Sequence, residues 1–347
     1  MDSAQLTALI SALEGRTVAV IGDVVADEFV YGRVARVSRE APVLILEYDS
    51  TEIVPGAGGN AANNVAALGG RAALVSIVGR DDAARRLLAA LHPRVKSTGV
   101  ARVAGGTVIK TRILAGGIHS AKQQVVRIDR GVGQSVDSQA RARFERAVLA
   151  SLPDVDAVLM SDYGSGLVTP TLARRVMAAL RRAGHPIPVL IDSRYRLLDY
   201  RGLTACTPNE SEVEQALGVR INDNARVLES AGREILKQTA MKAVLITRGS
   251  RGMALFAPGA PTVHIPIHGS DEIADVTGAG DTVMATLTLA LAAGATFEAA
   301  ARLANYAGGI VVMKRGTATV SRHELRAAVN NVSRRSTSAR RGAKADG

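Results

Sequence analysis

The chain has 347 residues, of which 47% are hydrophobic and 22% charged, a composition typical of a folded protein with a large core. Its formal charge is +11, but residues 331–347 hold five basic residues against one acidic, and we interpret this stretch as a basic disordered tail. Because only 3% of the residues are aromatic and Trp is absent, the composition argues against base-stacking platforms, and no nucleic-acid partner is expected.

Cysteine content and hydropathy bear on the cellular compartment. Cys206 is the only cysteine, so no disulfide can form within the chain and a reducing compartment is expected. Residues 1–16 lack the basic and then apolar segments of a signal peptide. The uncharged run 282–297 is shorter than the roughly 20 residues that a membrane span needs. These features predict a cytoplasmic protein without a membrane partner.

Four short apolar runs predict buried parallel strands: residues 17–23, 157–162, 188–192 and 243–249. Stretches between them, such as residues 169–184, predict crossover helices, so the expected fold class is α/β, with a mostly parallel central sheet flanked by helices. The runs end near Asp23, Asp162, Asp192 and Thr247. Such residues lie at the carboxyl edge of the sheet, where ligands bind, although each alone also suits a turn or a helix cap.

Two segments, about residues 28–50 and 105–130, alternate in polarity and predict a small antiparallel β-sheet. In the second segment, one face carries Ile109, Thr111 and Ile113, and the other carries Lys110 and Arg112. Val126 and Ile128 likewise oppose Arg127 and Asp129. A sheet with one apolar and one basic face suits a lid over an anionic ligand, and a sheet edge guarded by charges is the alternative. We expect one catalytic domain at residues 1–330, followed by the tail.

Glycine-rich motifs narrow the chemistry. Residues 56–61 match the dinucleotide fingerprint G-x-G-x-x-A, but we expect Pro55 to interrupt any strand before them, which makes the match weak. No Gly-Lys pair occurs in the chain, so a Walker loop is excluded. The six histidines show no metal-ligand spacing.

The stretch DVTGAGDT, residues 275–282, runs from a glycine turn into an apolar helix. The amides of Gly278, Ala279 and Gly280 can converge on one anion, and the positive end of the helix adds to them. Asp281 either caps this helix or accepts the proton of a hydroxyl while the amides stabilise a phosphoryl group in transit. The loop therefore predicts a site for a transferring phosphate.

DVTGAGDT resembles the second signature of the ribokinase-like (PfkB) carbohydrate kinases, and PGAGGNAANNVAALGG, residues 55–70, resembles the first. The resemblance covers about residues 16–325. The segments YGRVARVSREAP, SDYGSG, TPNESEVE and GTATVS are similar to those of a subgroup, the heptose 7-phosphate kinases. The resemblance implies a ribokinase-like fold with a β-sheet lid. It also implies transfer of phosphate from ATP to the anomeric hydroxyl of D-glycero-D-manno-heptose 7-phosphate, a step toward the ADP-heptose of lipopolysaccharide cores.

The same resemblance implies a role for each matching residue. Asp281 would be the base, and Gly278, Ala279 and Gly280 the anion hole. The sugar would contact Asp23, Gly58, Gly59 and Asn60, and its existing phosphate would contact Lys110, Arg112 and Arg127. Asn209 and Glu212 would position Mg²⁺ and the phosphates of ATP, whose adenine nucleotide would lie against Thr247, Gly249 and Gly252. Asp275 and Thr277 match the place of a monovalent cation such as K⁺, and relatives form homodimers through such lids.

Departures from the family pattern bear on the substrate. Ser165 and the pair Ser193–Arg194 stand where lysines are usual, and only Arg194 restores a positive charge. Gly58 and Gly59 replace alanines, and GGIHSAK, residues 116–122, lengthens a lid loop. The chain ends without room for the nucleotidyltransferase domain of the bifunctional enzymes, so a separate adenylyltransferase is expected. A kinase for another sugar or sugar phosphate (ribose, fructose, fructose 6-phosphate) is the main alternative, and a non-catalytic sugar-phosphate sensor and a dinucleotide oxidoreductase are minor ones.

Overall fold

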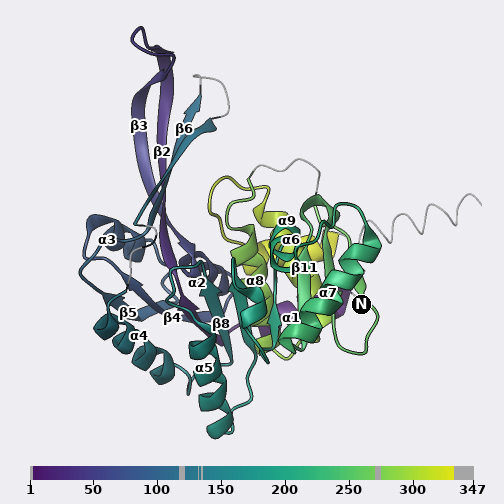
Figure 1. Ribbon diagram of the computed structural model, residues 1–347. Helices are drawn as coiled ribbons and strands as arrows, with labels where there is room; N and C mark the ends of the chain where they lie inside the picture. The colour runs from purple at the N-terminus through teal and green to yellow at the C-terminus, as the bar shows by residue number, and fades with distance from the viewer. Residues whose placement is uncertain (1–2, 117–121, 132, 134–135, 270–274, 332–347) are drawn as a thin grey trace, which may run out of the picture.

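The computed structural model describes residues 3–116, 122–131, 133, 136–269 and 275–331 (Figure 1). The basic tail and most of the lengthened lid loop that the sequence predicts lie outside the described residues. None of the helices in the described ranges combines the length and apolar character that crossing a membrane requires.

A nine-stranded sheet forms the centre of the molecule, in the order β13-β12-β11-β10-β9-β8-β1-β4-β5. Its strands are β1 (Thr17–Gly22), β4 (Arg71–Val78), β5 (Val95–Arg102), β8 (Ala157–Asp162), β9 (Val189–Ser193), β10 (Ala205–Cys206), β11 (Ala243–Thr247), β12 (Met253–Phe256) and β13 (Val263–Ile265). Neighbouring strands from β11 to β5 are parallel, whereas β12 and β13 add an antiparallel edge. The four apolar runs of the sequence form β1, β8, β9 and β11, which confirms the α/β prediction.

Helices cover both faces of this sheet (Figure 1). Successive strand residues point to opposite sides, and because the strands are apolar throughout, both faces need to be buried. Val18 and Val20 of β1 belong to one buried core, and Ala19 and Ile21 belong to the other. The first core includes residues of α1 (Ser3–Ala12), α2 (Gly58–Ala67), α3 (Asp82–Ala89), α8 (Ala279–Ala292) and α9 (Phe297–Val311). The second includes residues of α4 (Ser138–Ala150), α5 (Pro170–Arg182), α6 (Glu210–Leu217) and α7 (Ala225–Thr239).

A second sheet of four strands projects from the body as the lid (Figure 1). Its order is β3-β2-β6-β7, with β2 (Val24–Val37), β3 (Leu44–Ala57), β6 (Ile109–Gly116) and β7 (Gln123–Arg130). The expected lid sheet is confirmed, but its first two strands extend beyond residues 28–50, and β2 pairs with β6 in parallel. The expectation that Pro55 interrupts the strand is wrong. Pro55 lies within β3, because β3 is an edge strand and needs no amide there for an outer neighbour.

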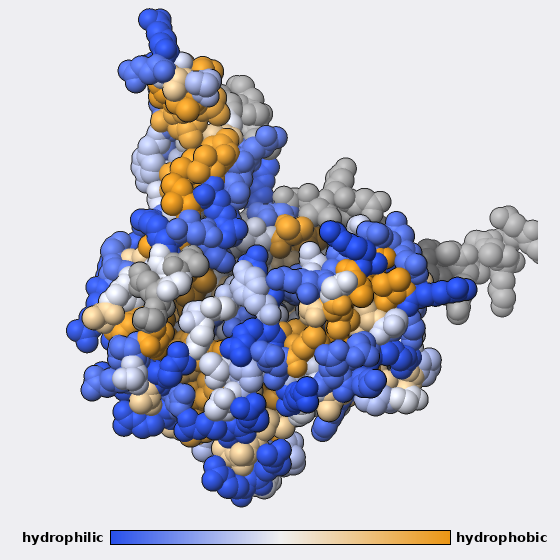
Figure 2. All heavy atoms as spheres, viewed as in Figure 1, coloured by the Kyte–Doolittle hydropathy of each residue, from blue (hydrophilic) through white to orange (hydrophobic). Residues whose placement is uncertain are grey.

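The register of the lid strands sorts their side chains into two faces. We call one the apolar lid face. Its members Val34, Tyr48, Val126 and Ile128 have exposed fractions between 40 and 68%. Figure 2 shows apolar side chains gathered along the projecting lid. The opposite face carries Lys110, Arg112, Arg127 and Asp129, and it contributes residues to the cavity described next.

Candidate active site

The site begins where the glycine turn enters α8. Gly278 has φ 76, a left-handed conformation that favours glycine, and a Cβ there would lie 2.5 Å from Nδ2 of Asn60. The amide of Ala279 donates to the carbonyl of Val276 at 3.2 Å, so it is engaged within the turn. The amide of Gly280 lies in the first turn of α8, where no intrahelical acceptor is available. The turn therefore presents the positive end of a long, buried helix.

Asp281, in the first turn of α8, is 4% exposed and accepts two hydrogen bonds from distant parts of the chain. The hydroxyl of Tyr163 donates to Oδ1 at 2.9 Å, and Nδ2 of Asn60 donates to Oδ2 at 3.0 Å. Burial raises the pKa of Asp281 to about 7, against the lowering effect of these two donors. A carboxylate with this pKa can accept a proton near neutral pH, which a helix cap need not do.

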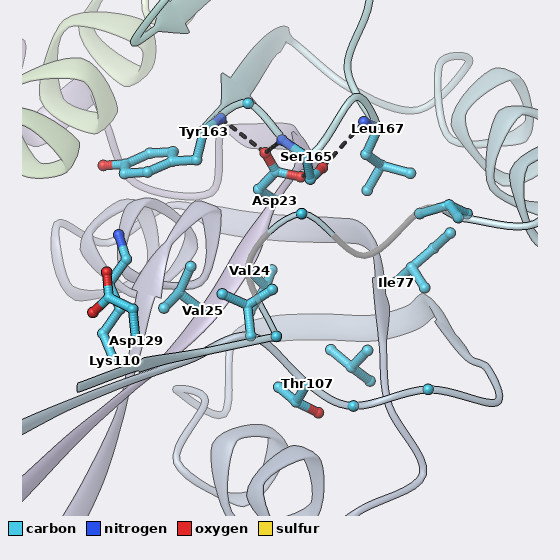
Figure 3. Close-up of a pocket in the computed structure, with 18 of the residues that line it drawn as sticks. Asp23, Val24, Val25, Ile77, Thr107, Lys110, Asp129, Tyr163, Ser165 and Leu167 are labelled. Carbon is cyan, nitrogen blue, oxygen red and sulfur yellow. Dashed lines mark hydrogen bonds between the residues drawn. The ribbon is translucent and has the colours of Figure 1, made fainter.

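Asp23 is the single residue between β1 and β2, and it lies at the wall of the site (Figure 3). Its carboxylate accepts the backbone amide of Tyr163 at 2.8 Å and the hydroxyl of Ser165. Its carbonyl accepts the amide of Gly58 at 2.9 Å, which joins the start of α2 to the same point. Burial raises the pKa of Asp23. Ser165 is part of the hydrogen-bond network of Asp23.

A cavity of about 420 Å³ lies between the base of the lid and the carboxyl edge of the main sheet (Figure 3). One part is polar and contains Asp23, Lys110, Arg127, Asp129, Tyr163, Ser165 and Arg194. Another part is apolar and includes Val24, Val25, Ile77 and Leu167. The cavity is therefore large enough for a small polar ligand and open to the lid cations.

Of the three lid cations expected to bind the phosphate of the sugar, two line the cavity and Arg112 does not. Lys110 and Arg127 line the cavity, and Arg127 also pairs with Asp129 at 2.7 Å. Burial lowers the pKa of Lys110, and the nearby positive charges of Arg127 and Arg194 lower it further. Arg112 does not line the cavity among the described residues. Its guanidinium donates to Asp27 at 2.6 Å and lies 5.4 Å from the ring centroid of Phe29.

The residues expected to bind the nucleotide gather beyond β10 and β11. Asn209 and Glu212 form the capping box of α6. The amide of Glu212 donates to the side chain of Asn209 at 2.9 Å, and the amide of Asn209 donates to the side chain of Glu212 at 3.0 Å. A second cavity, of about 700 Å³, is lined by Asn209, Thr247 and Gly249. Gly252 lies outside its lining, and a Cβ at Gly252 would lie 2.1 Å from the carbonyl oxygen of Ile265. The fold alone therefore explains that glycine.

Asp192 on β9, Thr207 after β10 and Glu212 on α6 carry oxygen groups of the kind that Mg²⁺ prefers. Within the described ranges, no three His, Cys, Asp or Glu side chains are arranged to hold a metal ion. Mg²⁺ usually keeps several waters and binds through one or two carboxylates together with substrate phosphates. Burial raises the pKa of Glu212, and burial with the nearby charges of Asp281 and Glu212 raises that of Asp192. The buried hydroxyl of Thr207, beside β9, finds no hydrogen-bond partner in the described structure. These groups suit one hydrated cation.

Asp275 and Thr277, the residues expected to hold a monovalent cation, lie together, and Asp275 also contacts the loop that contains Gly316. Asp275 accepts the amide of Thr277 at 2.8 Å and the amide of Gly316 at 3.0 Å.

Among the sugar-site residues, Gly58, Gly59 and Asn60 form the start of α2. The dinucleotide match at residues 56–61 does connect a strand to a helix, but that strand belongs to the lid rather than to a parallel βαβ unit.

Tyr163 is a functional candidate that the sequence did not single out, whereas Arg194 was expected to restore a positive charge. Tyr163 follows the last residue of β8, and Arg194 follows β9, so both lie at the carboxyl edge that the strand pattern marks. Arg194 lines the cavity near Lys110, where it replaces the charge of a usual lysine. In the sequence, the position of each residue directly after a buried strand indicates that it lies near the site. That position does not show where its long side chain points.

Comparison with known proteins agrees with this geometry. The family described as pfkB family carbohydrate kinase matches residues 16–324. The bifunctional protein HldE of Caulobacter sp. (strain K31) is 42% identical over 92% of this chain, and that of Geobacter sulfurreducens is 40% identical over 88%. The chain spans 64% and 61% of the lengths of these two relatives.

Solved structures show the same fold at low identity. Ribokinase of Arabidopsis thaliana, complexed with ribose and ATP, has a TM-score of 0.67 at 20% identity and covers 91% of this chain and 99% of its own. Phosphofructokinase-2 of Escherichia coli, in complex with potassium, has a TM-score of 0.71 at 18% identity, with 92% and 99% covered. From the family match and the relatives, the chain belongs to the pfkB family of carbohydrate kinases, phosphotransferases whose acceptor is an alcohol group.

Proposed function

We propose that the protein transfers the terminal phosphoryl group of ATP to the anomeric hydroxyl of D-glycero-D-manno-heptose 7-phosphate, giving the 1,7-bisphosphate for ADP-heptose synthesis. The observation that carries the proposal is a buried carboxylate, Asp281, which accepts the hydroxyl of Tyr163 behind the wall of a cavity lined by Tyr163, Lys110, Arg127 and Arg194. The similarity to proteins named HldE and the heptose-kinase motifs of the sequence support this choice of sugar.

In the proposed reaction, Asp281 accepts the proton of the anomeric hydroxyl as that oxygen attacks the terminal phosphorus of ATP. A new bond forms between oxygen and phosphorus, and the bond from phosphorus to the bridging oxygen of ADP breaks. The start of α8, with the amides of Gly278 and Gly280, stabilises the negative charge of the phosphoryl group in transit. Because the Ala279 amide already serves the turn, it adds less to this stabilisation than the sequence predicts.

A sugar that already carries a phosphate explains the cluster of cations. Lys110, Arg127 and Arg194 line one polar region, where Asp129 pairs with Arg127. Asp27 and Asp129 partly offset the repulsion between Lys110 and the two arginines, and a bound phosphate would offset it further. In the proposal, the 7-phosphate occupies this region and Asp23, Gly58, Gly59 and Asn60 hold the sugar ring. Arg112 supports the lid through Asp27 instead of binding the phosphate.

ATP occupies the groove of Asn209, Thr247 and Gly249 in the proposal, with Gly252 shaping the adjacent turn. Asn209 and Glu212 would hold Mg²⁺ beside the phosphates of ATP, where a divalent cation would supply positive charge to offset theirs. K⁺ is assigned to the loop of Asp275 and Thr277. The kinase unit is residues 1–330, with the basic tail appended, and it forms a homodimer through the lid. Because the substrates are ATP and a sugar phosphate, the proposal places the reaction in the cytoplasm.

The test is ADP release with ATP and Mg²⁺ across a panel containing the heptose 7-phosphate, ribose, fructose and fructose 6-phosphate, with and without K⁺. We expect the heptose phosphate to be preferred. Turnover of another sugar alone would overturn the heptose assignment and leave the kinase chemistry.

The role of Asp281 as the base is tested by a substitution at that residue. Asp281→Asn should lower the rate by roughly 10²-fold or more, because general base catalysis contributes about that much. Asp156→Asn is a matched control, since Asp156 pairs with Arg16 and accepts the amide of Thr17, at the opposite end of β1. Retention of most of the rate by Asp281→Asn would show that another group takes the proton.

A further inference from the structure

Tyr163 contacts both carboxylates of the site through two different parts of the residue. Its backbone amide donates to Asp23 at 2.8 Å, and its hydroxyl donates to Asp281 at 2.9 Å. Asp23 lies between β1 and β2, and Asp281 lies on α8, 258 positions later. Two links join these residues: Tyr163, and the start of α2, where Gly58 donates to the carbonyl of Asp23 and Asn60 donates to Asp281. Under the proposed function, one carboxylate holds the sugar and the other accepts its proton.

The hydrogen bonds at Asp281 leave room for the acceptor hydroxyl. Tyr163 occupies one lone pair of Oδ1 and Asn60 one lone pair of Oδ2, while each carboxylate oxygen has two. Asn60 is itself held, because Nδ2 of Asn64 donates to its side-chain oxygen at 3.0 Å. Two fixed donors therefore set the plane of the carboxylate and leave one lone pair on each oxygen for a further donor.

Charged and polar groups face Asp281 from every neighbouring element. Asp27 on β2 disfavours its ionised form and Lys110 on β6 favours it, while the charge of Asp281 helps to raise the pKa of Asp192 on β9. Tyr163 after β8 and Asn60 on α2 favour the ionised form by donating hydrogen bonds to it. Burial and the neighbouring charge of Asp281 raise the pKa of Tyr163 well above its usual range, so its hydroxyl stays a neutral donor. Lys110 lies 5.3 Å from the centroid of the Tyr163 ring, which holds the ring in place.

We propose that Tyr163 is a positioning residue, whose hydroxyl orients the Asp281 carboxylate and keeps it ionised for proton transfer from the bound sugar. This inference rests on the proposed role of Asp281 as the base. Tyr163→Phe is a clean test, because it keeps the backbone bond to Asp23 and removes only the bond to Asp281.

The experiment measures kcat and KM of Tyr163→Phe between pH 5.5 and 9.5 with the sugar that the wild type uses. Loss of a hydrogen bond to a charged acceptor should move the acid limb of the kcat profile upward by about one pH unit. The rate should fall roughly tenfold at pH 6 and recover above pH 9, with KM for the sugar nearly unchanged. Tyr200→Phe is the matched control, since the buried hydroxyl of Tyr200 donates to Asp162 at 2.7 Å and does not touch Asp281. It should lower stability and leave the acid limb in place.

Two kinetic results would overturn the inference: an equal loss of kcat at every pH, or an increase of KM with no shift of the limb. A readout without sugar separates this failure from failure of the proposed function. The pH dependence of unfolding is compared for wild type, Tyr163→Phe, Asp281→Asn and the double variant. Coupling between the two residues should grow as Asp281 ionises, even if no sugar in the panel is turned over. Absence of that coupling would refute the role of Tyr163.

Discussion

Ala57 adopts a backbone conformation that an alanine rarely accepts. Its φ is 53 and its ψ is −130, at the junction of β3 and α2. Strain of this kind costs on the order of 1–3 kcal/mol, and glycine relieves it while losing somewhat more entropy on folding. Ala57→Gly should therefore raise the free energy of unfolding by about 1 kcal/mol, measured by urea denaturation. Gly59→Ala, two positions later, is the opposite control, because its Cβ would lie 2.9 Å from Cβ of Pro55. A loss of stability in Ala57→Gly would contradict the strain argument.

The pKa of Asp281 also predicts a pH dependence of stability. Its pKa is about 7 in the folded protein and near 3.8 when exposed, so between these values the folded state binds the extra proton. Stability therefore falls as pH rises through this window. Asp281→Asn removes that fall, so its stability relative to wild type should rise between pH 4 and pH 7, by at most about 4 kcal/mol. Thermal unfolding at several pH values measures the trend, and a difference that stays constant with pH would contradict it.

Residue identities at the site were predictable where local sequence determines their placement. Gly278 and Asp281 follow from one turn and one helix start, whereas Asn209 and Glu212 came from the family resemblance, and the structure shows them as the capping box of α6. Tyr163 could not be found this way, because its partner Asp281 is 118 positions away and the contact depends on the packing of α8 against β8. The placement of Arg112 depends on strand register in the same manner.

The lid strands present two cavity cations whose removal should weaken sugar-phosphate binding. Lys110→Ala and Arg127→Ala should each raise KM for the phosphorylated sugar roughly tenfold or more, because a charge-assisted contact is lost, and leave KM for ATP nearly unchanged. Lys122→Ala is the matched control, since Lys122 pairs with Asp49 at 2.5 Å and does not line the cavity. Equal effects on both substrates would assign the two cations to the nucleotide or to the fold.

Arg112 on β6 and Asp27 on β2 tie the base of the lid together. Their side chains are 11% and 8% exposed, and Asp27 also accepts the hydroxyl of Thr317 at 3.1 Å. Arg112→Ala should lower the free energy of unfolding by about 3–5 kcal/mol, because it leaves a buried carboxylate without its cation. Arg130→Ala, which removes an exposed pair with Glu28 on the same sheet, should cost at most about 1 kcal/mol. Unchanged urea denaturation with a higher KM for the sugar phosphate would instead make Arg112 a substrate contact.

At the scale of elements, continuous apolar runs identified the central strands because both faces of a parallel sheet are buried. The lid strands were located less well, since an edge strand tolerates Pro55 and its ends are fixed by contacts with the body. The parallel pairing of β2 with β6 joins residues about 83 positions apart, as in the bond from Thr111 to Glu28. No local pattern predicts such a pairing, because chain order does not determine which strands meet.

The apolar lid face gives the whole molecule a surface that suits a second copy of itself. Val126 and Ile128 are 48% and 46% exposed in the single chain, beside other apolar residues of the same sheet. If two lids pack through this face, Ile128→Asp should weaken the dimer by roughly tenfold or more, because a charge would be buried there. Sedimentation measures the dissociation constant, and Met313→Asp, an exposed apolar residue outside the lid, is the control. A monomeric wild type would refute lid-mediated pairing.

The passage from β1 to β2 through Asp23 alone has a thermodynamic consequence. A rotation of the lid about the β1–β2 junction would change the backbone angles at or next to the residue that is proposed to hold the sugar. Sugar affinity and lid orientation are then linked, and the linkage is reciprocal. If dimerisation fixes the lid, the factor by which sugar tightens the dimer equals the factor by which the dimer tightens sugar binding.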